Sequence, residues 1–326
     1  MQETQKRCIV IIVGCVILSF LYFQFHESLP ITRYRDDSPA KATVPIKTNN
    51  DVPQPGYFKA QPEWDWAAPA DASWRGNAQK LQNSEIVILT ASDGKGHNSA
   101  VPNILERVLD DREKYDIGDA ERTWSKIPAV AEAFYLLPKA KWVWLVDTDI
   151  IIMSPSTSLI SDILSPSAIE HGIMRDTPIL DGMIEDNPTH INMPKEYRVQ
   201  DIDILATQDH QSINSGSIFF RRSAFTRMLL EMMTDHTMMG HEHLGAEQDS
   251  IRHLMLEHQL VRQHVGIYPQ RKFNAYVQGG SNMGYRDGDL VVHLAGCWVT
   301  ESCKDWFEQY WGKRGHTDVW RPEEGQ

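Results

Sequence analysis

Two aspartates interrupt a long apolar stretch near the middle of the chain. In KWVWLVDTDIIIMSP, residues 141–155, apolar side chains precede Asp147 and follow Asp149. Burying two carboxylates costs free energy unless a positive charge compensates them. Hard cations such as Mg²⁺ or Mn²⁺ prefer carboxylate oxygens, and with a partly filled shell they also bind a diphosphate. The alternative is a strand end with two solvated aspartates, and the D-x-D pattern alone does not decide between them.

The elements around this stretch predict an α/β fold with a central, mostly parallel sheet. The continuous apolar run at 142–146 is typical of a strand that is buried on both faces of such a sheet. In an open α/β sheet, ligands bind at the carboxyl ends of the strands. Further strands are expected at 85–90, 202–208, 217–220 and 289–294, and helices at 100–112, 124–137, 223–233 and from Asp249 onward.

Polar residues near the expected strand ends are candidates for a ligand site. The first strand ends in ASDGKGHN, residues 91–98, whose glycines would let backbone N–H groups approach a phosphate or a base. Lys126 precedes a helix turn and could reach a phosphate, although a solvated lysine is the default. Residues 214–216, Asn-Ser-Gly, are predicted to form a tight turn before the strand at 217–220, and such turns are also common for structural reasons.

Acidic and histidine residues in the C-terminal half offer further candidates. Glu247 and Asp249 lie where a helix is expected to start, so they either complement its positive end or point into a site. His293 lies among apolar residues in the last expected strand. A buried histidine is usually only hydrogen-bonded, but a neutral imidazole can complete the shell of a cation held by the two aspartates. His241 and His243, in a polar loop, are expected to be solvated.

The N-terminal region predicts a membrane anchor. Residues 8–23 are almost uninterruptedly apolar, with Lys6 and Arg7 before them, which favours a signal-anchor whose N-terminus stays in the cytosol. A cleaved signal peptide is the alternative. Prolines punctuate the following residues and no apolar period holds there, as in a linker. The expected organisation is a cytosolic tail at 1–7, a transmembrane helix at 8–25, a lumenal stem at 26–84 and a catalytic domain at 85–326.

Charge and cysteine content narrow the class of protein. The net charge of −12 argues against a general nucleic-acid binder, which needs a basic surface. Cys297 and Cys303 are six residues apart in CWVTESC. In an oxidising lumen they could close a small loop as a disulfide, and two free thiols are the alternative.

Six stretches, in order, resemble glycosyltransferase family 34. This family includes fungal Golgi α-1,6-mannosyltransferase subunits, α-1,2-galactosyltransferases and plant xyloglucan xylosyltransferases. The matching stretches are ILTASDGKGHN (88–98), WSKIPAV (124–130), WVWLVDTDIIIMSP (142–155), INSGSIFFRR (213–222), EQDS (247–250) and VVHLAGCW (291–298).

The resemblance implies a GT-A-type fold that binds a nucleotide-sugar, a Mn²⁺ cofactor and transfer with retention of anomeric configuration. It also implies a role for each matching residue. The implied metal ligands are Asp147, Asp149 and His293; the donor-binding residues are Thr90, Ala91, Ser92, Lys126, Asp147 and Thr148; Asn214, Ser215 and Gly216 lie beside the sugar and acceptor; and Gln248 and Asp249 lie near the anomeric carbon as catalytic candidates.

The expected function is a metal-dependent hexosyltransferase of the Golgi membrane, single-pass and type II, with its catalytic domain in the lumen. Its partners would be a nucleotide-sugar, a glycan acceptor and other mannosyltransferase subunits. GDP-mannose, used for α-1,6-linked mannan outer chains of N-glycans, is preferred over UDP-galactose used for α-1,2 linkages.

Two other functions compete with this expectation. One is a catalytically weak scaffold subunit. Residues 109–124 contain no second apolar strand, where members of the family usually have one near the base pocket. A metal-dependent phosphohydrolase is the other. It would require a second metal about 3.5–4 Å from the first, and no second acidic cluster stands out.

Overall fold

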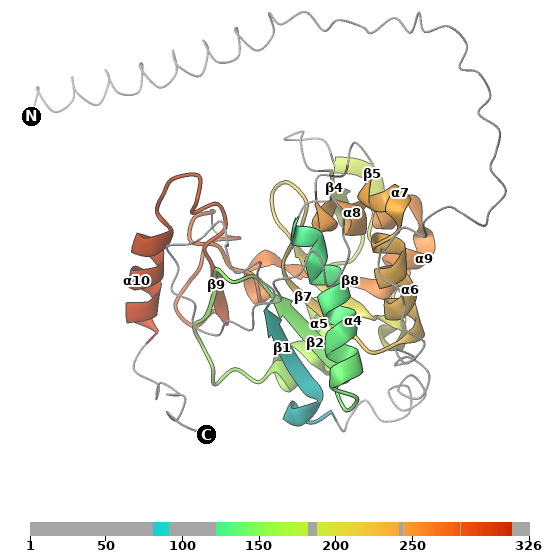
Figure 1. Ribbon diagram of the computed structural model, residues 1–326, viewed down its shortest axis with the longest axis horizontal. Coiled ribbons are helices and arrows are strands. Elements are labelled where there is room, and N and C mark those ends of the chain that lie inside the picture. Colours follow the sequence, from blue (N-terminus) through green and yellow to red (C-terminus); the bar gives the residue numbers. More distant parts are fainter. Residues whose placement is uncertain are drawn as a thin grey trace, which may run out of the picture. The chain divides into compact units, whose positions relative to one another are not determined.

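The structure is a computed structural model that describes residues 81–90, 122–181, 188–240, 244, 246–280 and 282–314 (Figure 1). The predicted cytosolic tail, transmembrane helix and loop at 91–98 lie outside these residues, as do the helix at 100–112 and all but the last four residues of the stem. Among the described helices, none has both the length and the apolar character that crossing a bilayer requires.

A five-stranded mixed sheet forms the centre of the fold. Its strand order is β1-β2-β7-β6-β8. β1 pairs in parallel with β2, β6 pairs in parallel with β8, and β7 is antiparallel to both of its neighbours. The predicted α/β fold is therefore confirmed, but the sheet is mixed, because two of its four strand pairings are antiparallel. β8 was not among the predicted strands. The bounds are β1 Ile86–Thr90, β2 Trp142–Val146, β6 Ile204–Gln208, β7 Ile213–Arg221 and β8 Val265–Pro269.

The predicted turn at residues 214–216 is wrong, because these residues lie inside β7. Backbone partners on both sides hold this part of the chain extended. Asn214 is in register with Thr207 of β6, and the Gly216 carbonyl accepts a hydrogen bond from the Asp147 N–H at 2.8 Å. The Asn-Ser-Gly sequence is thus placed between the ends of β2 and β6 and does not precede the strand.

Helices cover both faces of the sheet, which explains why β2 is apolar at every position. Val143 and Leu145 pack toward α4 (Lys126–Leu136), α6 (Ala224–Met233) and α8 (Glu247–Glu257). Trp142 and Trp144 pack on the other face with residues of the π-helix η5 (Ile160–Leu164) and of α5 (Pro166–Gly172). Figure 1 shows α4 lying along the sheet beside β1 and β2.

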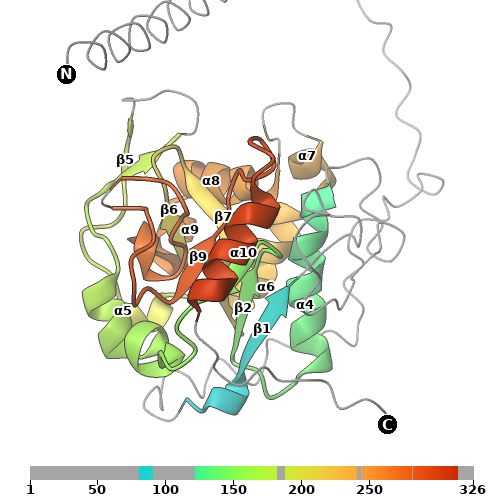
Figure 2. The same ribbon diagram turned by 90° about the vertical axis from the view of Figure 1, so that its left-hand side faces the viewer.

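A smaller layer lies at the carboxyl end of β2. β3 (Ile150–Ile152) pairs antiparallel with β9 (Val291–His293), and α10 (Cys303–Lys313) packs against this pair (Figure 2). A disulfide joins Cys297 and Cys303 and so fixes the start of α10 to the segment after β9. The remaining described elements are β4 (Pro178–Leu180), β5 (Pro188–Asn192), α7 (His236–Met239), α9 (Gln259–His264) and the short 3-10 helices η3 (Asn83–Glu85), η4 (Arg122–Ser125), η6 (Val199–Asp201) and η7 (Gln270–Lys272).

A buried arginine after β7 holds the end of α4 against the start of β2. The last carbonyls of a helix have no partner within the helix, so another group must satisfy them. The Arg222 side chain donates to the carbonyl oxygens of Phe134 at 2.5 Å, Leu137 at 2.9 Å and Ala140 at 2.6 Å. One guanidinium thereby fixes the turn that leads from α4 into the strand before Asp147.

We predict that Arg222→Met lowers the free energy of unfolding by about 2–4 kcal/mol, because it leaves buried carbonyls without donors. The matched control is Arg227→Met. Arg227 forms an ion pair with Glu231 at 3.0 Å on the surface of α6, so its loss should change stability by less than about 0.5 kcal/mol. Urea unfolding of both variants measures the difference, and equal effects would contradict the capping role of Arg222.

Candidate functional site

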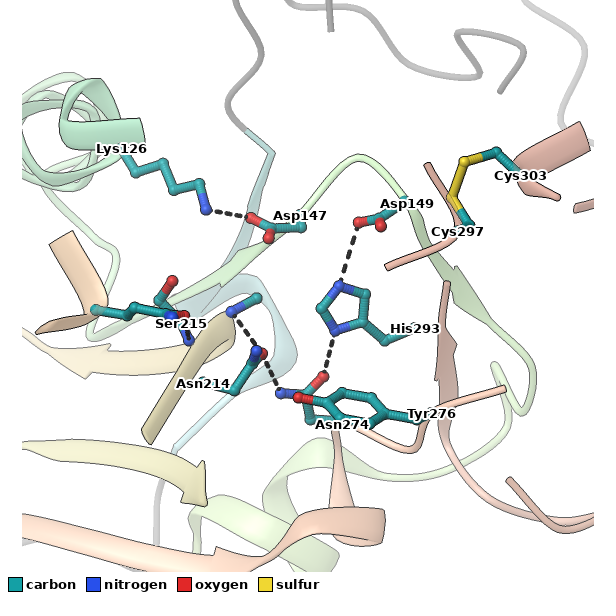
Figure 3. A network of polar contacts seen from close by, with 12 residues as sticks. Lys126, Asp147, Asp149, Asn214, Ser215, Asn274, Tyr276, His293, Cys297 and Cys303 are labelled. Carbon is teal, nitrogen blue, oxygen red and sulfur yellow. Dashed lines mark hydrogen bonds and ion pairs between the residues drawn. A yellow bond between two sulfur atoms is a disulfide. The ribbon is translucent and has the colours of Figure 1, made fainter. Parts of the chain in front are cut away.

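Asp147, Asp149 and His293 gather at the carboxyl end of β2, although the histidine is far away in the sequence. The antiparallel register pairs Ile150 with His293, and the Leu294 N–H donates to the Asp149 carbonyl at 2.9 Å. One ligand atom from each of the three side chains lies within 4.8 Å of the other two. Figure 3 shows Asp149 and His293 facing each other, and Asp147 beside them with its carboxylate toward Lys126.

The donor set fits a divalent cation. Oxygen ligands lie about 2.1–2.6 Å from Mg²⁺ or Ca²⁺, so two ligands on opposite sides of one ion are separated by up to about 5 Å. The observed limit of 4.8 Å satisfies this condition. Two carboxylates and one imidazole suit several divalent ions, and this donor set does not select one of them.

The imidazole and the neighbouring carboxylate compensate each other's burial. His293 Nε2 lies 3.3 Å from Asp149 Oδ1, and both residues are buried. Burial alone would lower the pKa of His293, but the Asp149 carboxylate raises it. Burial alone would raise the pKa of Asp149, but the charge of His293 lowers it. The pair therefore favours an imidazolium beside a carboxylate, and a divalent cation would supply the same positive charge.

A buried lysine joins the site to α8. Lys126 Nζ lies 2.7 Å from Asp147 Oδ1 and 2.9 Å from Glu247 Oε1. Burial alone would lower the pKa of Lys126, but the two carboxylates raise it. From the residues alone the default is a solvated lysine, and this default is wrong, because the Lys126 side chain is only 12% exposed. The family resemblance implies that Lys126 binds the donor phosphate. The structure places its ammonium between two carboxylates, so direct phosphate contact stays a prediction.

Glu247 also belongs to this network. The sequence left open whether it complements the helix start or points into a site, and its contacts with Lys126 and Ser215 favour the site. Its Oε1 accepts a hydrogen bond from Ser215 Oγ at 2.7 Å, and the residue is almost completely buried. Burial alone would raise the pKa of Glu247, but Lys126 lowers it. Its place beside Gln248 at a helix start was the available signal, and its burial could not be inferred from that position.

The strand residues 214–216 lie against the candidate metal ligands. A Cβ atom added to Gly216 would meet His293 Cε1 at 2.3 Å, so only glycine fits here without movement. Asn214 Oδ1 accepts a hydrogen bond from the Gly216 N–H at 3.0 Å. The Ser215 N–H points to Gln248 Oε1 at 3.4 Å. The structure thus brings the predicted sugar-side residues next to both His293 and the start of α8.

Asn274 is a site residue that the sequence analysis missed. It lies between β8 and β9, in a stretch with no predicted strand, helix or motif. The side chain is fully buried, and its Oδ1 lies 2.8 Å from His293 Nδ1. Tyr276 stands nearby, with its ring centroid 5.5 Å from that of His293 and its hydroxyl donating to Asp209 at 2.7 Å.

The other predicted residues are less closely gathered. Asp249 Oδ1 lies 3.3 Å from the guanidinium of Arg252, one turn further along α8. Thr90 ends β1, and its buried hydroxyl has no hydrogen-bond partner among the described residues. Thr148 is exposed between the two aspartates. Ala91, Ser92, His241 and His243 lie outside the described residues.

Comparison with known proteins assigns the family. Residues 82–304 match the galactosyl transferase GMA12/MNN10 family, glycosyltransferase family 34. The chain belongs to this family. The resemblance inferred from the sequence is therefore confirmed, and this member of family 34 is a glycosyltransferase.

Curated fungal relatives support the same family. The chain is 32% identical over 258 residues to the probable α-1,2-galactosyltransferase gmh2 of Schizosaccharomyces pombe, covering 74% of this chain and 75% of the relative. It is 33% identical over 244 residues to the probable α-1,2-galactosyltransferase gmh1 of the same organism, covering 70% and 74%. It is 29% identical over 195 residues to the probable α-1,6-mannosyltransferase MNN10 of Saccharomyces cerevisiae, covering 55% and 47%.

We predict that Gly216→Ala in this family 34 transferase lowers the free energy of unfolding by about 1–3 kcal/mol, because the new methyl group overlaps the His293 ring. Transfer activity should fall even at temperatures where the variant is fully folded, because the displaced His293 ring leaves the candidate metal site. Thermal unfolding and turnover measure the two effects.

Gly312→Ala is the matched control. Nothing lies within 4 Å of a Cβ added at Gly312, and the residue lies inside α10, where alanine is favoured over glycine by up to about 1 kcal/mol. It should leave activity unchanged. Wild-type stability and turnover in Gly216→Ala would contradict the close packing of β7 against His293.

Proposed function

We propose that the chain is a divalent-metal-dependent hexosyltransferase with a GT-A-type fold, and that it retains the anomeric configuration of the sugar. The proposed reaction moves a hexose from a nucleotide-sugar to a glycan. The observation that carries the proposal is the meeting of Asp147, Asp149 and His293 within 4.8 Å in a member of glycosyltransferase family 34. Mn²⁺ is the proposed ion.

The proposed roles follow from what each residue contacts. When bound at the three ligands, Mn²⁺ supplies positive charge that stabilises a leaving nucleoside diphosphate. Lys126 holds the Asp147 carboxylate in place, with its Nζ 2.7 Å from Asp147 Oδ1. Thr148, between the aspartates, and Thr90, Ala91 and Ser92, after β1, are the proposed contacts to the donor nucleotide.

The sugar is proposed to lie beside β7 and the start of α8. Asn214, Ser215 and Gly216 line this side, and Gln248 is held there through the Ser215 N–H. Breaking the bond from the anomeric carbon to the diphosphate leaves positive charge on the sugar, which a nearby carboxylate stabilises. Asp249 is the proposed carboxylate, acting electrostatically.

Two donors are candidates. GDP-mannose is the donor expected from the sequence, whereas the two Schizosaccharomyces pombe relatives are both named as probable α-1,2-galactosyltransferases. The Saccharomyces cerevisiae relative named as a probable α-1,6-mannosyltransferase has lower identity and coverage. These names favour UDP-galactose, and GDP-mannose is the second candidate.

The cellular setting is part of the proposal. A signal-anchor at 8–25 would place the transferase in the Golgi membrane with its catalytic domain in the lumen. Other mannosyltransferase subunits would be partners if mannose is the donor sugar. The Cys297–Cys303 disulfide supports a lumenal location, because disulfides persist in oxidising compartments.

We predict that the full chain, purified in detergent, turns over one of the two donors with Mn²⁺ and stops in EDTA. Asp149→Ala should reduce turnover by about 10²–10³-fold, because it removes a ligand of the cation that would stabilise the leaving diphosphate. Asp162→Ala is the control, since Asp162 is exposed and should leave turnover unchanged. Released nucleotide and transferred sugar are measured for UDP-galactose and GDP-mannose.

Three outcomes contradict the proposal, the third in a parallel assay with simple phosphate esters. Turnover that persists in EDTA and in Asp149→Ala would remove the cation from the mechanism. A folded protein that is silent with both donors would favour the scaffold function. Hydrolysis of phosphate esters that lack a sugar would favour the phosphohydrolase.

We also predict that Asp249→Asn keeps donor affinity and stability but lowers turnover by about 10²–10³-fold, because a neutral amide stabilises positive charge on the sugar less well. The matched control is Asp235→Asn. Asp235 accepts from the Thr237 N–H at 2.8 Å at the start of α7, a bond that asparagine also accepts. Full activity in Asp249→Asn would exclude Asp249 from the mechanism.

A further inference from the structure

Asn274 is a fully buried amide that connects a candidate metal ligand with the strand that carries the sugar-side residues. Its Nδ2 donates to Asn214 Oδ1 at 2.8 Å and to Thr207 Oγ1 at 3.0 Å. Its Oδ1 lies 2.8 Å from His293 Nδ1. Figure 3 shows this chain of contacts running from Asn214 through Asn274 to the imidazole.

The direction of every hydrogen bond in this chain follows from one backbone N–H. Gly216 N–H can only donate, and it donates to Asn214 Oδ1 at 3.0 Å. Asn214 Oδ1 is therefore an acceptor, and the atom of Asn274 that faces it must be the NH₂ group. The other end of the Asn274 amide is then its oxygen, which requires a proton on His293 Nδ1.

This proton decides which ring nitrogen is available to a cation. Without a cation the ring is an imidazolium with a proton on each nitrogen, and a cation would take the place of one of these protons. Because Nδ1 keeps its proton for the Asn274 oxygen, the lone pair that becomes available is the one on Nε2. Nε2 is the nitrogen that faces Asp149 Oδ1, at 3.3 Å. Histidines that bind metals usually donate their other ring N–H to an oxygen, which fixes both the tautomer and the orientation of the ring.

We propose that Asn274 is a positioning residue that holds His293 as the tautomer with a free Nε2 and thereby sets the affinity of the site for its cation. The inference deepens the proposed function and rests on the metal site assigned there. Asn274 itself contacts neither the cation nor the donor. Through Asn214 it also ties the imidazole to the strand beside the transferred sugar.

The test compares two substitutions of Asn274 in the full chain, in detergent, without any sugar donor. Asn274→Leu has a similar shape but removes the oxygen that accepts from Nδ1. Asn274→Asp keeps an oxygen there and loses the donor to Asn214. The probe is Mn²⁺ alone. Its affinity is measured from the electron paramagnetic resonance of the free ion, and its direct bond to a ring nitrogen from ¹⁴N modulation of the electron spin echo.

The expected result separates the two variants. Asn274→Leu should bind Mn²⁺ about 10–100-fold more weakly, with the ¹⁴N modulation reduced or lost. Asn274→Asp should keep the modulation and an affinity within about threefold of the wild type. Undiminished affinity and modulation in Asn274→Leu would overturn the proposal. If Asn274→Leu does not fold, loss of the modulation in folded Asn274→Asp would overturn it, and retention would support it.

Two controls distinguish a positioning role from a general loosening of the loop. Gln270→Met removes a donor to the Asn274 backbone carbonyl, at 2.7 Å, and leaves the Asn274 side chain in place. It should lower stability but keep the ¹⁴N modulation. Adding Asn274→Leu to His293→Ala should not weaken Mn²⁺ binding further, because Asn274 acts through the imidazole. An additive loss would contradict the proposal.

The outcome is independent of the transfer assay. A chain that binds Mn²⁺ with the expected ¹⁴N response but transfers no sugar would refute the proposed activity and support the role of Asn274. A wild-type chain that shows no ¹⁴N modulation with bound Mn²⁺ would overturn the ligand role of His293, and this inference with it.

Discussion

The site depends on positive groups that compensate the negative charge of carboxylates buried away from water. Asp149 and Glu247 are buried, and Asp147 is partly buried beside them. A carboxylate in such a place is stable only when a positive charge lies close to it. His293 supplies the positive charge beside Asp149, and Lys126 supplies it beside both Asp147 and Glu247. The elements that carry these groups must therefore keep each buried carboxylate close to a positive charge. A divalent cation would supply this charge to Asp147 and Asp149, where the imidazolium of His293 supplies it in the absence of a metal.

β7 is the element on which this arrangement depends most. Two chains of side-chain contacts leave neighbouring residues of this strand and end on different candidate metal ligands. They run Asn214–Asn274–His293 and Ser215–Glu247–Lys126–Asp147. Gly216 lies between β2 and the imidazole, where any side chain would overlap the His293 ring. The metal side and the proposed sugar side are thus one connected polar network, and a shift of β7 would disturb both.

The sequence predicts those parts of the fold and of the site that depend on a local pattern of residues. The continuous apolar run at 142–146 predicted a strand buried on both faces, and aspartates directly after it predicted the place of the site. Residues 214–216 were predicted as a turn, because their types favour turns. Thr207, opposite Asn214, is only seven residues away, but Asp147, which donates to the Gly216 carbonyl, is distant in the sequence. Asn274 was missed because no pattern marks it and only the fold brings it to His293. Glu247 was a candidate from its place at a helix start, but its contact with Lys126 also depends on the fold.

The central claim is that Asp147, Asp149 and His293 hold one divalent cation beside a nucleotide-sugar site. The most direct measurement is anomalous diffraction at the manganese edge from crystals grown with Mn²⁺ and a nucleoside diphosphate. We expect one strong peak in contact with both carboxylates and with His293 Nε2, and a diphosphate on its open side. A bound diphosphate with the manganese peak elsewhere, or with no peak among these three side chains, would contradict it.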